Sequence, residues 1–248
     1  MHTHEFHIQS GSLFGKKLGK QLQSKRTVAS RVIELLWENK VDALFINDGT
    51  STSYVWCYYI TRWVAERRNH PLTVWTNNYD VAMQALCEPQ APVCMRIKVA
   101  PGEFSFQFCA MLGDDTTAWV ADKSQDKTCL LAVTALDAQV GPCGRSHDAK
   151  EIKKVLLDKA GPLIVVADAE KLSQPRDPFL AASETSWQER LNQKKHRIWV
   201  FTDLDKSLLS KASFAAHRHP STPLQWQEEN ARVLRGALGD HFVTVPSL

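Results

Sequence analysis

The chain has 248 residues, of which 44% are hydrophobic and 23% charged, and this composition excludes collagen-like, coiled-coil and disordered proteins. Its 30 basic and 27 acidic residues give a net charge of +3, too small to indicate nucleic-acid binding by itself. No apolar run approaches the roughly 20 residues of a membrane helix, and the polar N-terminal segment lacks a signal-peptide core. We therefore expect a cytoplasmic protein with no membrane partner.

The cysteines and the N-terminal histidines are the candidate metal ligands. The six cysteines are scattered, with no C-x-x-C pair and no zinc-ligand spacing. Disulfides would be an alternative in a secreted protein, but most of the cysteines lie in apolar stretches, so we expect thiols in the core. His2, His4 and His7 could hold a metal, but we interpret residues 1–15 as a flexible tail. The prediction is therefore no metal and no cofactor.

Helix and strand patterns alternate along the first half of the chain. Apolar residues at helical spacing predict an amphipathic helix over residues 16–40, whose lysines and arginines fit a solvated outer face. A short apolar run over 41–46 then ends in a turn of small polar residues. This order is typical of the first half of a βαβ unit. Further patterns predict strands over 72–75 and 93–99, and helices over 54–67 and 79–86.

The second half continues the alternation around a strongly apolar strand. The run over 162–167 is the most continuous in the chain, as expected of a strand covered on both faces. A change to Pro, Ser, Gln and charged residues over 173–195 predicts an insertion or lid. Helical spacing is weak over 105–112. Other patterns predict strands over 117–121, 128–134, 197–201 and 241–245, and helices over 147–159 and 223–238. The fold class predicted is α/β, one domain over 16–248 with a Rossmann-like, mostly parallel sheet and helices on both faces.

Polar clusters follow several predicted strands at their carboxyl ends. Asp48 and Gly49 follow the first strand, Thr76-Asn77-Asn78 the second, and Asp168 the most apolar one. Ligands of open parallel sheets bind outside these strand ends. The sequence therefore predicts one binding cleft at this edge of the sheet.

The turn Asp48-Gly49-Thr50-Ser51-Thr52-Ser53 carries the strongest local signal. Gly49 allows a sharp turn and a close backbone approach, and the hydroxyl residues after it open the next helix. Free N–H groups and the helix dipole then favour an anion, phosphate above all. A plain Ser/Thr helix cap is the alternative, and the turn is neither a Walker A loop nor a G-x-G-x-x-G motif.

The same turn, with the segment Leu72–Ala82 (LTVWTNNYDVA), resembles the effector domain of DeoR-type sugar-metabolism repressors. In that family a D-S-G-T-T turn precedes L-T-V-x-T-N. Further segments resemble the family in the same order: Ala100–Phe104, Gly113, Leu131–Asp137 with Gly141, Asp148–Lys153, Leu163–Lys171 and Val200–Asp203.

The resemblance implies a fold related to ribose-5-phosphate isomerase, glucosamine-6-phosphate deaminase and CoA transferases, with a cleft for a phosphorylated sugar. It implies that Gly49, Thr50, Ser51 and Thr52 hold the phosphate. The other implied contacts are Thr76 and Asn77 toward the sugar, Gly102 and Glu103 on the opposite wall, and Asp137, Lys150, Asp168 and Lys171 as polar and charged groups.

The resemblance also bears on partners. DeoR-type repressors carry a helix-turn-helix ahead of this domain, and only about fifteen residues precede the first predicted helix here. We therefore expect a stand-alone sensor of a phosphorylated small molecule that does not contact DNA directly. Relatives assemble through this domain, so we expect a homo-oligomer, and a separate protein partner stays open.

Two other functions stay open. An isomerase or deaminase would use Asp148 as the base, Lys150 or Lys171 as the cation and Asp137 as an assistant. Asp148 could equally stabilise a helix start, and Lys150 and Lys153 could be solvated. The second alternative is a protein-interaction module that has lost its ligand, because eight tryptophans are many and tryptophan is enriched at interfaces, although a core role is their default.

Overall fold

A computed structural model of the chain describes residues 13–67, 69–88, 94–172, 180–192, 198–204 and 223–244. Seven parallel strands form the central sheet: β1 Ala43–Ile46, β2 Leu72–Thr76, β3 Met95–Val99, β6 Thr128–Ala132, β9 Leu163–Val166, β11 Ile198–Thr202 and β12 Phe242–Thr244. Their order is β12-β11-β9-β6-β1-β2-β3. The chain runs outward from β1 through β2 to β3, then returns to place β6 on the other side of β1. The predicted mostly parallel α/β fold is confirmed.

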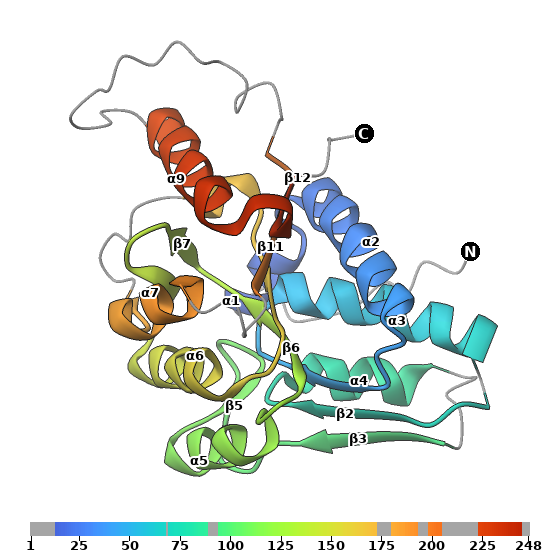
Figure 1. Cartoon of the computed structure of the whole chain (residues 1–248). Helices are drawn as coiled ribbons and strands as arrows, with labels where there is room; N and C mark the ends of the chain where they lie inside the picture. Colours follow the sequence, from blue (N-terminus) through green and yellow to red (C-terminus); the bar gives the residue numbers. More distant parts are fainter. Residues whose placement is uncertain are drawn as a thin grey trace.

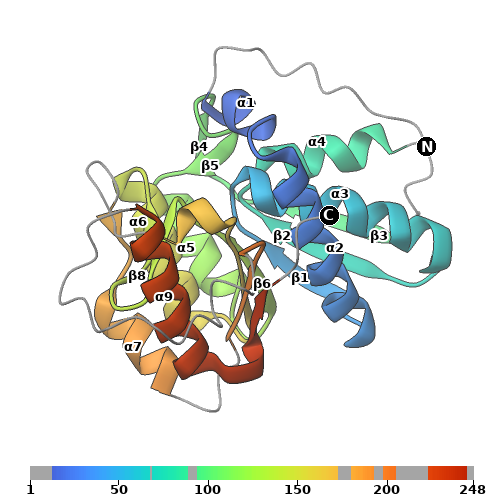
Figure 2. The ribbon, with the colours of Figure 1, turned by 90° about the horizontal axis from the view of Figure 1, so that it is seen from above.

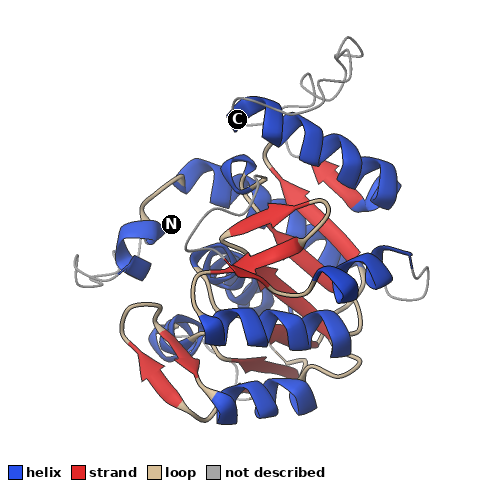
Figure 3. Cartoon of the chain, turned by 90° about the vertical axis from the view of Figure 1, so that its left-hand side faces the viewer, coloured by secondary structure: helices blue, strands red, loops and turns tan. Residues whose placement is uncertain are grey.

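Helices cover both faces of this sheet, as Figures 1, 2 and 3 show. One face carries α2 Leu22–Glu38, α3 Thr50–Arg67 and α4 Tyr79–Cys87. The other carries α5 Asp114–Lys123, α6 His147–Lys159, α7 Glu184–Asn192 and α9 Pro223–Leu238. A short helix, α1 Leu13–Leu18, precedes α2. No helix in the described part of the chain is long and apolar enough to cross a membrane.

Strand periodicity builds a separate core on each face. In β1, Phe45 points to the core under α5 and α6, while Leu44 and Ile46 point to the core under α2 and α3. Leu131 and Leu130 divide in the same way, because successive side chains of a strand face opposite sides. Burial on both faces explains why these strands read as continuous apolar runs and not as alternating ones.

One segment of the predicted secondary structure is wrong, and another had only a weak pattern. Residues 105–112, where helical spacing is weak, belong to a hairpin of β4 Glu103–Ser105 and β5 Ala110–Leu112, with Cys109 in the left-handed region at φ 53°. Residues 117–121 were expected to be a strand but lie within α5. The buried residues Thr116 and Val120 are four apart, which is a helical period, and two aspartates open the helix.

The predicted helix over 16–40 is also interrupted. The structure has α1 and α2 instead, separated by residues 19–21, with Gln21 left-handed at φ 53°. The Lys25 ammonium donates hydrogen bonds to the carbonyl oxygens of Lys17 and Lys20 and is 3.5 Å from that of Leu18. Lys25 is only 5% exposed, so this lysine of the expected solvated face instead satisfies the C-terminal carbonyls of α1.

The segment predicted as an insertion or lid, 173–195, is described over 180–192. Strand β10 Leu180–Ala181 pairs with β8 Gly141–Gly144, which also pairs with β7 Ala135–Asp137, in a small antiparallel sheet. In α7, Trp187 is fully buried and its Nε1 donates to the Ala138 carbonyl oxygen at 3.0 Å. The lid role stays a prediction. Most of the predicted tail, with its three histidines, lies outside the described residues, and Leu13–Gly15 belong to α1.

The six cysteines differ in their exposure to solvent. Cys129 and Cys143 are buried, whereas Cys87 is exposed and the other three are half-buried. The expected core location is therefore right for two of the six. Within the described ranges, no group of three or more histidine, cysteine, aspartate or glutamate side chains could hold a metal ion.

The turn between β1 and α3 is tight because of Gly49. Its φ is +135°, a conformation that glycine adopts readily, and a Cβ added there would lie 2.5 Å from the Ala132 Cβ at the end of β6. Gly49 therefore lets the first turn of α3 approach β6 closely, between the two strands where the chain changes direction across the sheet.

Gly49→Ala is predicted to destabilise the domain through both strain and steric overlap. Gly113→Ala is the matched control, since Gly113 also has a positive φ (+98°) but nothing lies within 4 Å of an added Cβ. We expect Gly49→Ala to lower the free energy of unfolding by about 1–3 kcal/mol more than Gly113→Ala, measured by denaturant titration. Equal losses would show that the contact with Ala132 does not constrain this turn.

Candidate functional site

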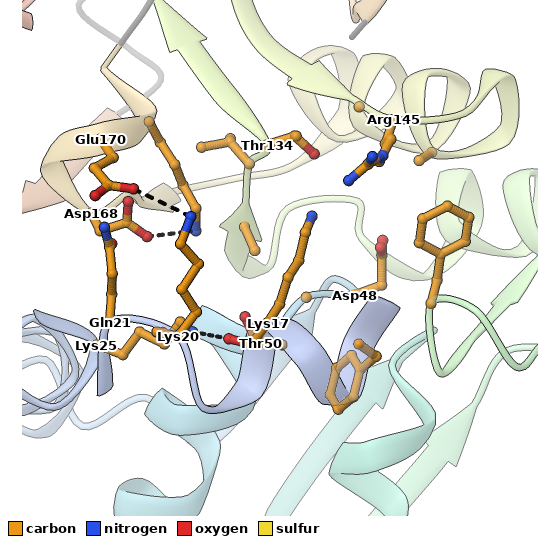
Figure 4. Close-up of a pocket in the computed structure, with 18 of the residues that line it drawn as sticks. Lys17, Lys20, Gln21, Lys25, Asp48, Thr50, Thr134, Arg145, Asp168 and Glu170 are labelled. Carbon is orange, nitrogen blue, oxygen red and sulfur yellow. Dashed lines mark hydrogen bonds and ion pairs between the residues drawn. The ribbon is translucent and has the colours of Figure 1, made fainter. Parts of the chain in front are cut away.

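A pocket of about 340 Å³ opens at the carboxyl ends of β1, β6 and β9 (Figure 4). Three of its walls come from segments that follow these strands: residues 48–50, 132–134 and 168–171. The start of α6, the α1–α2 segment and Phe108 of the β4–β5 hairpin complete it. Because β1 and β6 flank the point where the strand order reverses, the pocket lies where open α/β sheets bind ligands. A cavity therefore lies at the edge of the sheet where the binding cleft is predicted, and ligand binding in it stays a prediction.

The hydroxyl residues of the turn form the first turn of α3, which begins at Thr50 and not at Tyr54 as expected. The Ser53 N–H already donates to the Gly49 carbonyl oxygen at 3.1 Å, whereas the N–H groups of residues 50–52 have no acceptor within the helix. Thr50 lines the pocket, and the Ser51 hydroxyl accepts from the Lys171 ammonium at 3.0 Å. The helix thus directs donors and its positive dipole end toward the cavity.

The remaining two hydroxyls stabilise the turn itself. Thr52 Oγ1 donates to the carbonyl oxygens of Asn47 at 2.7 Å and Gly49 at 2.8 Å, and Ser53 Oγ donates to that of Gly49 at 3.1 Å. Both side chains are buried and neither lines the pocket. The simple cap alternative does not describe them, because a capping hydroxyl accepts from backbone N–H groups.

A buried polar network forms the floor below Asp48. Asn77 Oδ1 accepts from the Asp48 N–H at 3.0 Å, and Asn47 Nδ2 donates to Asp48 Oδ1 at 2.7 Å. The Lys153 ammonium donates to Asn47 Oδ1 at 3.1 Å. Lys153 is 3% exposed and lines the pocket, so the alternative of a solvated side chain, left open by the sequence, does not apply to it. The network fixes a cation and a carboxylate beside each other at the pocket wall.

The cluster Thr76-Asn77-Asn78 lies behind the β1–α3 turn, and none of its side chains lines the pocket. Thr76 Oγ1 donates to the Ile46 carbonyl oxygen at 2.7 Å. Asn78 Nδ2 donates to the Gly49 carbonyl oxygen at 3.2 Å, and Asn78 Oδ1 accepts from the Asp80 N–H at the start of α4. The three residues therefore hold the turn in position, and direct contact with a sugar stays a prediction.

Positive charge predominates in the pocket lining. Two of the lysines pair with carboxylates, Lys171 with Asp168 at 3.0 Å and Lys20 with Glu170 at 3.6 Å (Figure 4). The cations are Lys17, Lys20, Lys25, Arg145, Lys153 and Lys171, and the acids are Asp48, Asp168 and Glu170. Six cations against three carboxylates leave an excess of three positive charges when all are ionised, which favours an anionic ligand.

Burial, together with neighbouring cations, lowers the pKa of several lysines of the pocket. Burial, and the positive charges of Lys171 and Arg145, lower the pKa of Lys17 to about 8. Burial and the charge of Lys171 also lower the pKa of Lys25 to about 8. For Lys153 the pKa is lowered mainly by burial, and nearby Asp48 opposes the shift. With pKa values of about 8, Lys17 and Lys25 are only partly protonated in the slightly alkaline range.

Five more predicted site residues lie outside the pocket lining, in addition to Ser51, Thr52 and the cluster Thr76-Asn77-Asn78. Gly102 and Glu103 lie at the start of the β4–β5 hairpin, where a Cβ at Gly102 would lie 2.3 Å from Thr116 Oγ1 and Glu103 is exposed. Asp137 Oδ1 accepts from the backbone N–H groups of Gln139 and Val140 at 2.8 and 3.0 Å. Asp148 and Lys150 are half-buried in the first turn of α6.

The catalytic set named from the sequence is thus not assembled in the cavity. Lys153 takes the place expected for Lys150, because Ala149 and Lys153 are four residues apart and share the helix face that lines the pocket. The charged residues of the lining that were not predicted from the sequence are Lys17, Lys20, Lys25, Arg145, Lys153 and Glu170. The helical spacing of Lys153 from Ala149 was the one available signal.

Residues 20–184 match the model of the DeoR C terminal sensor domain. The chain belongs to this family. A relative among characterised proteins is the HTH-type transcriptional regulator GlpR of Haloferax volcanii, 25% identical over 161 residues, which are 65% of this chain and 57% of the relative. This DeoR-type sensor domain therefore aligns with little more than half of that regulator.

Among solved structures, the sensor domain is similar to a D-ribose-5-phosphate isomerase in complex with phospho-erythronic acid. The TM-score is 0.37 at 15% identity, over 59% of this chain and 52% of the isomerase. A similarity this distant assigns no role to any residue of the pocket.

Asn77→Ala is predicted to destabilise the protein, because it leaves the buried Asp48 N–H and the Met111 carbonyl oxygen without their partner. We expect a loss of about 2–4 kcal/mol in the free energy of unfolding by denaturant titration, while Asn39→Ala, at an exposed helix end, changes it far less. Unchanged stability together with lost ligand binding would instead place Asn77 in contact with the ligand.

Proposed function

We propose that this sensor domain binds a phosphorylated sugar or a related small phosphometabolite in the pocket at the ends of β1, β6 and β9. The observation that carries the proposal is the convergence of the α3 N-terminus and six cationic side chains on one cavity. Membership of a sensor-domain family supports a role in detecting this ligand, and the relative in Haloferax volcanii is a transcriptional regulator. Action without direct DNA contact, and assembly as a homo-oligomer, stay predictions.

The pocket supplies groups for both parts of such a ligand. Backbone N–H groups of residues 50–52 and the ammonium of Lys171 suit a phosphate, which accepts several hydrogen bonds and carries up to two negative charges. The carboxylates of Asp48 and Asp168 accept hydrogen bonds only, and so suit sugar hydroxyls. A ligand with both features would satisfy the lining better than inorganic phosphate alone.

No specific observation favours the two alternative functions. The isomerase or deaminase needs Asp148 and a lysine at the reacting carbons, and Asp148 does not line the pocket. The interaction module was suggested by the tryptophans, but most of them pack within or against the two cores. These seven are Trp37, Trp56, Trp63, Trp75, Trp119, Trp187 and Trp199.

Phosphosugars are predicted to raise the melting temperature of the protein. A ligand at 100 times its Kd adds about 2.7 kcal/mol of stability, which corresponds to a rise of about 5–10 °C for a domain of this size. Thr50→Glu should abolish the rise by placing a carboxylate at the anion site, and Lys171→Gln should reduce it.

Thr61→Glu is the matched control for this test, because it adds the same charge to an exposed position of the same helix, away from the pocket. It should retain the full shift. A flat response of the wild-type protein to ribose 5-phosphate, fructose 6-phosphate, glycerol 3-phosphate and fructose 1,6-bisphosphate would contradict the proposal.

Ligand binding is also predicted to take up protons in the alkaline range. An anion near Lys17 and Lys25 raises their pKa values from about 8, so the bound protein holds more protons than the free protein. Uptake should be small at pH 7, where both lysines are already mostly protonated, and should grow toward pH 8.5, while affinity falls. Calorimetry in buffers of different ionisation enthalpy measures this proton uptake. An uptake that does not change with pH would contradict binding of the anion near Lys17 and Lys25.

A further inference from the structure

The α1 helix lies against the pocket as a separate short element. Phe14 and Lys17 of α1 line the cavity, and Figure 2 shows the helix beside β4 and β5. Its first residues are attached to the hairpin by the Phe14 N–H, which donates to the Gln107 carbonyl oxygen at 3.0 Å. Part of the cavity wall is therefore built from a six-residue helix that is not an element of the central sheet.

The two ends of α1 are attached very differently. At its C-terminal end, the Lys25 ammonium binds the carbonyl oxygens of residues 17 and 20, and the Tyr54 hydroxyl donates to that of Leu18 at 3.2 Å. Lys20 in the link to α2 pairs with Glu170. These contacts hold the link at residues 19–21 as a fixed point. The body of α1 packs against α3, and its Phe14 side chain is buried. Lys17 is its charged residue in the pocket lining.

Lys17 is the charged residue of α1 that lines the pocket. Its ammonium faces the positive charges of Lys171, Arg145 and Lys153, and Asp48 is the carboxylate that acts on it most strongly. Among the described residues, no carboxylate lies within ion-pair distance of Lys17. Figure 4 shows Lys17 and Arg145 reaching into the cavity from opposite walls. Like charges repel across the cavity unless an anion lies between them.

We propose that α1 is a ligand-controlled cover, held on the pocket when an anion bridges Lys17 to the cations of the opposite wall, and loosened when it does not. This rests on the proposed function, since it assumes that the anion binds in the same pocket. In this proposal Lys17 is a ligand contact supplied by a movable element, and the position of α1 reports whether the ligand is bound. The cover is α1, and the described residues of 180–192 take no part in lining the cavity.

Hydrogen exchange of the full chain, with and without saturating inorganic phosphate, tests the cover. Residues 48–53 report binding at the α3 turn, and residues 14–18 report the state of α1. We expect phosphate to slow exchange in both segments, by on the order of tenfold in α1. Slower exchange at 48–53 with no change at 14–18 would contradict the proposed role of α1 as a cover, but it would agree with the proposed function. No change in either segment would overturn both.

Lys17→Gln and Lys16→Gln form a matched pair on the same helix, because Lys16 is exposed and does not line the pocket. In Lys17→Gln, phosphate should still slow exchange at 48–53, at a concentration about tenfold higher or more, but should leave 14–18 unchanged. Lys16→Gln should behave as the wild type in both segments. Full protection of α1 in Lys17→Gln would overturn the role of this lysine.

Discussion

The mutual repulsion of cations around one cavity is the constraint on which the rest of this structure depends. Lys17, Lys153 and Lys171 come from three separate elements, and the positive charges of Lys171 and Lys153 add to the effect of burial in lowering the pKa of Lys17. Three carboxylates in the lining offset half of the positive charge, and burial together with neighbouring cations lowers the pKa values of Lys17 and Lys25 to about 8. A cavity with this balance favours anions over neutral sugars, and its affinity must fall as the lysines lose their protons.

The fold supplies a rigid side and a movable side for this cavity. The rigid side is the β1–α3 turn, which Gly49 brings against Ala132 and which the asparagines at positions 47, 77 and 78 hold from behind. Its donors are therefore preorganised before a ligand arrives, which reduces the cost of binding. The movable side is α1, attached at the link to α2 by Lys25. A sensor needs both, because a rigid site recognises the ligand and a movable element reports that it is bound.

Local sequence patterns predicted the parts of this design that arise within one element. Continuous apolar runs indicated the central strands, and the Gly49 turn and Asp168 indicated the strand ends where the pocket opens. Long-range pairing decided what they missed. The hairpin at 103–112 depends on the pairing of β4 with β5 and on the Met111 N–H, which donates to the Asn77 carbonyl oxygen at 2.8 Å. Local propensity does not decide it. The break at residues 19–21 depends on Lys25 folding back onto α1, which a helical pattern cannot show. Lys153 lies on the pocket face of α6, but only the packing of that helix distinguishes this face from the one that carries Lys150.

The most direct test of the proposed phosphate site is a crystal structure of the protein with the phosphosugar that stabilises it most. We expect the phosphate to lie against the backbone N–H groups of residues 50–52 and within hydrogen-bond distance of a lysine of the opposite wall, with Lys17 turned toward it. A phosphosugar bound elsewhere on the domain, or one whose phosphate points away from the α3 turn, would contradict it.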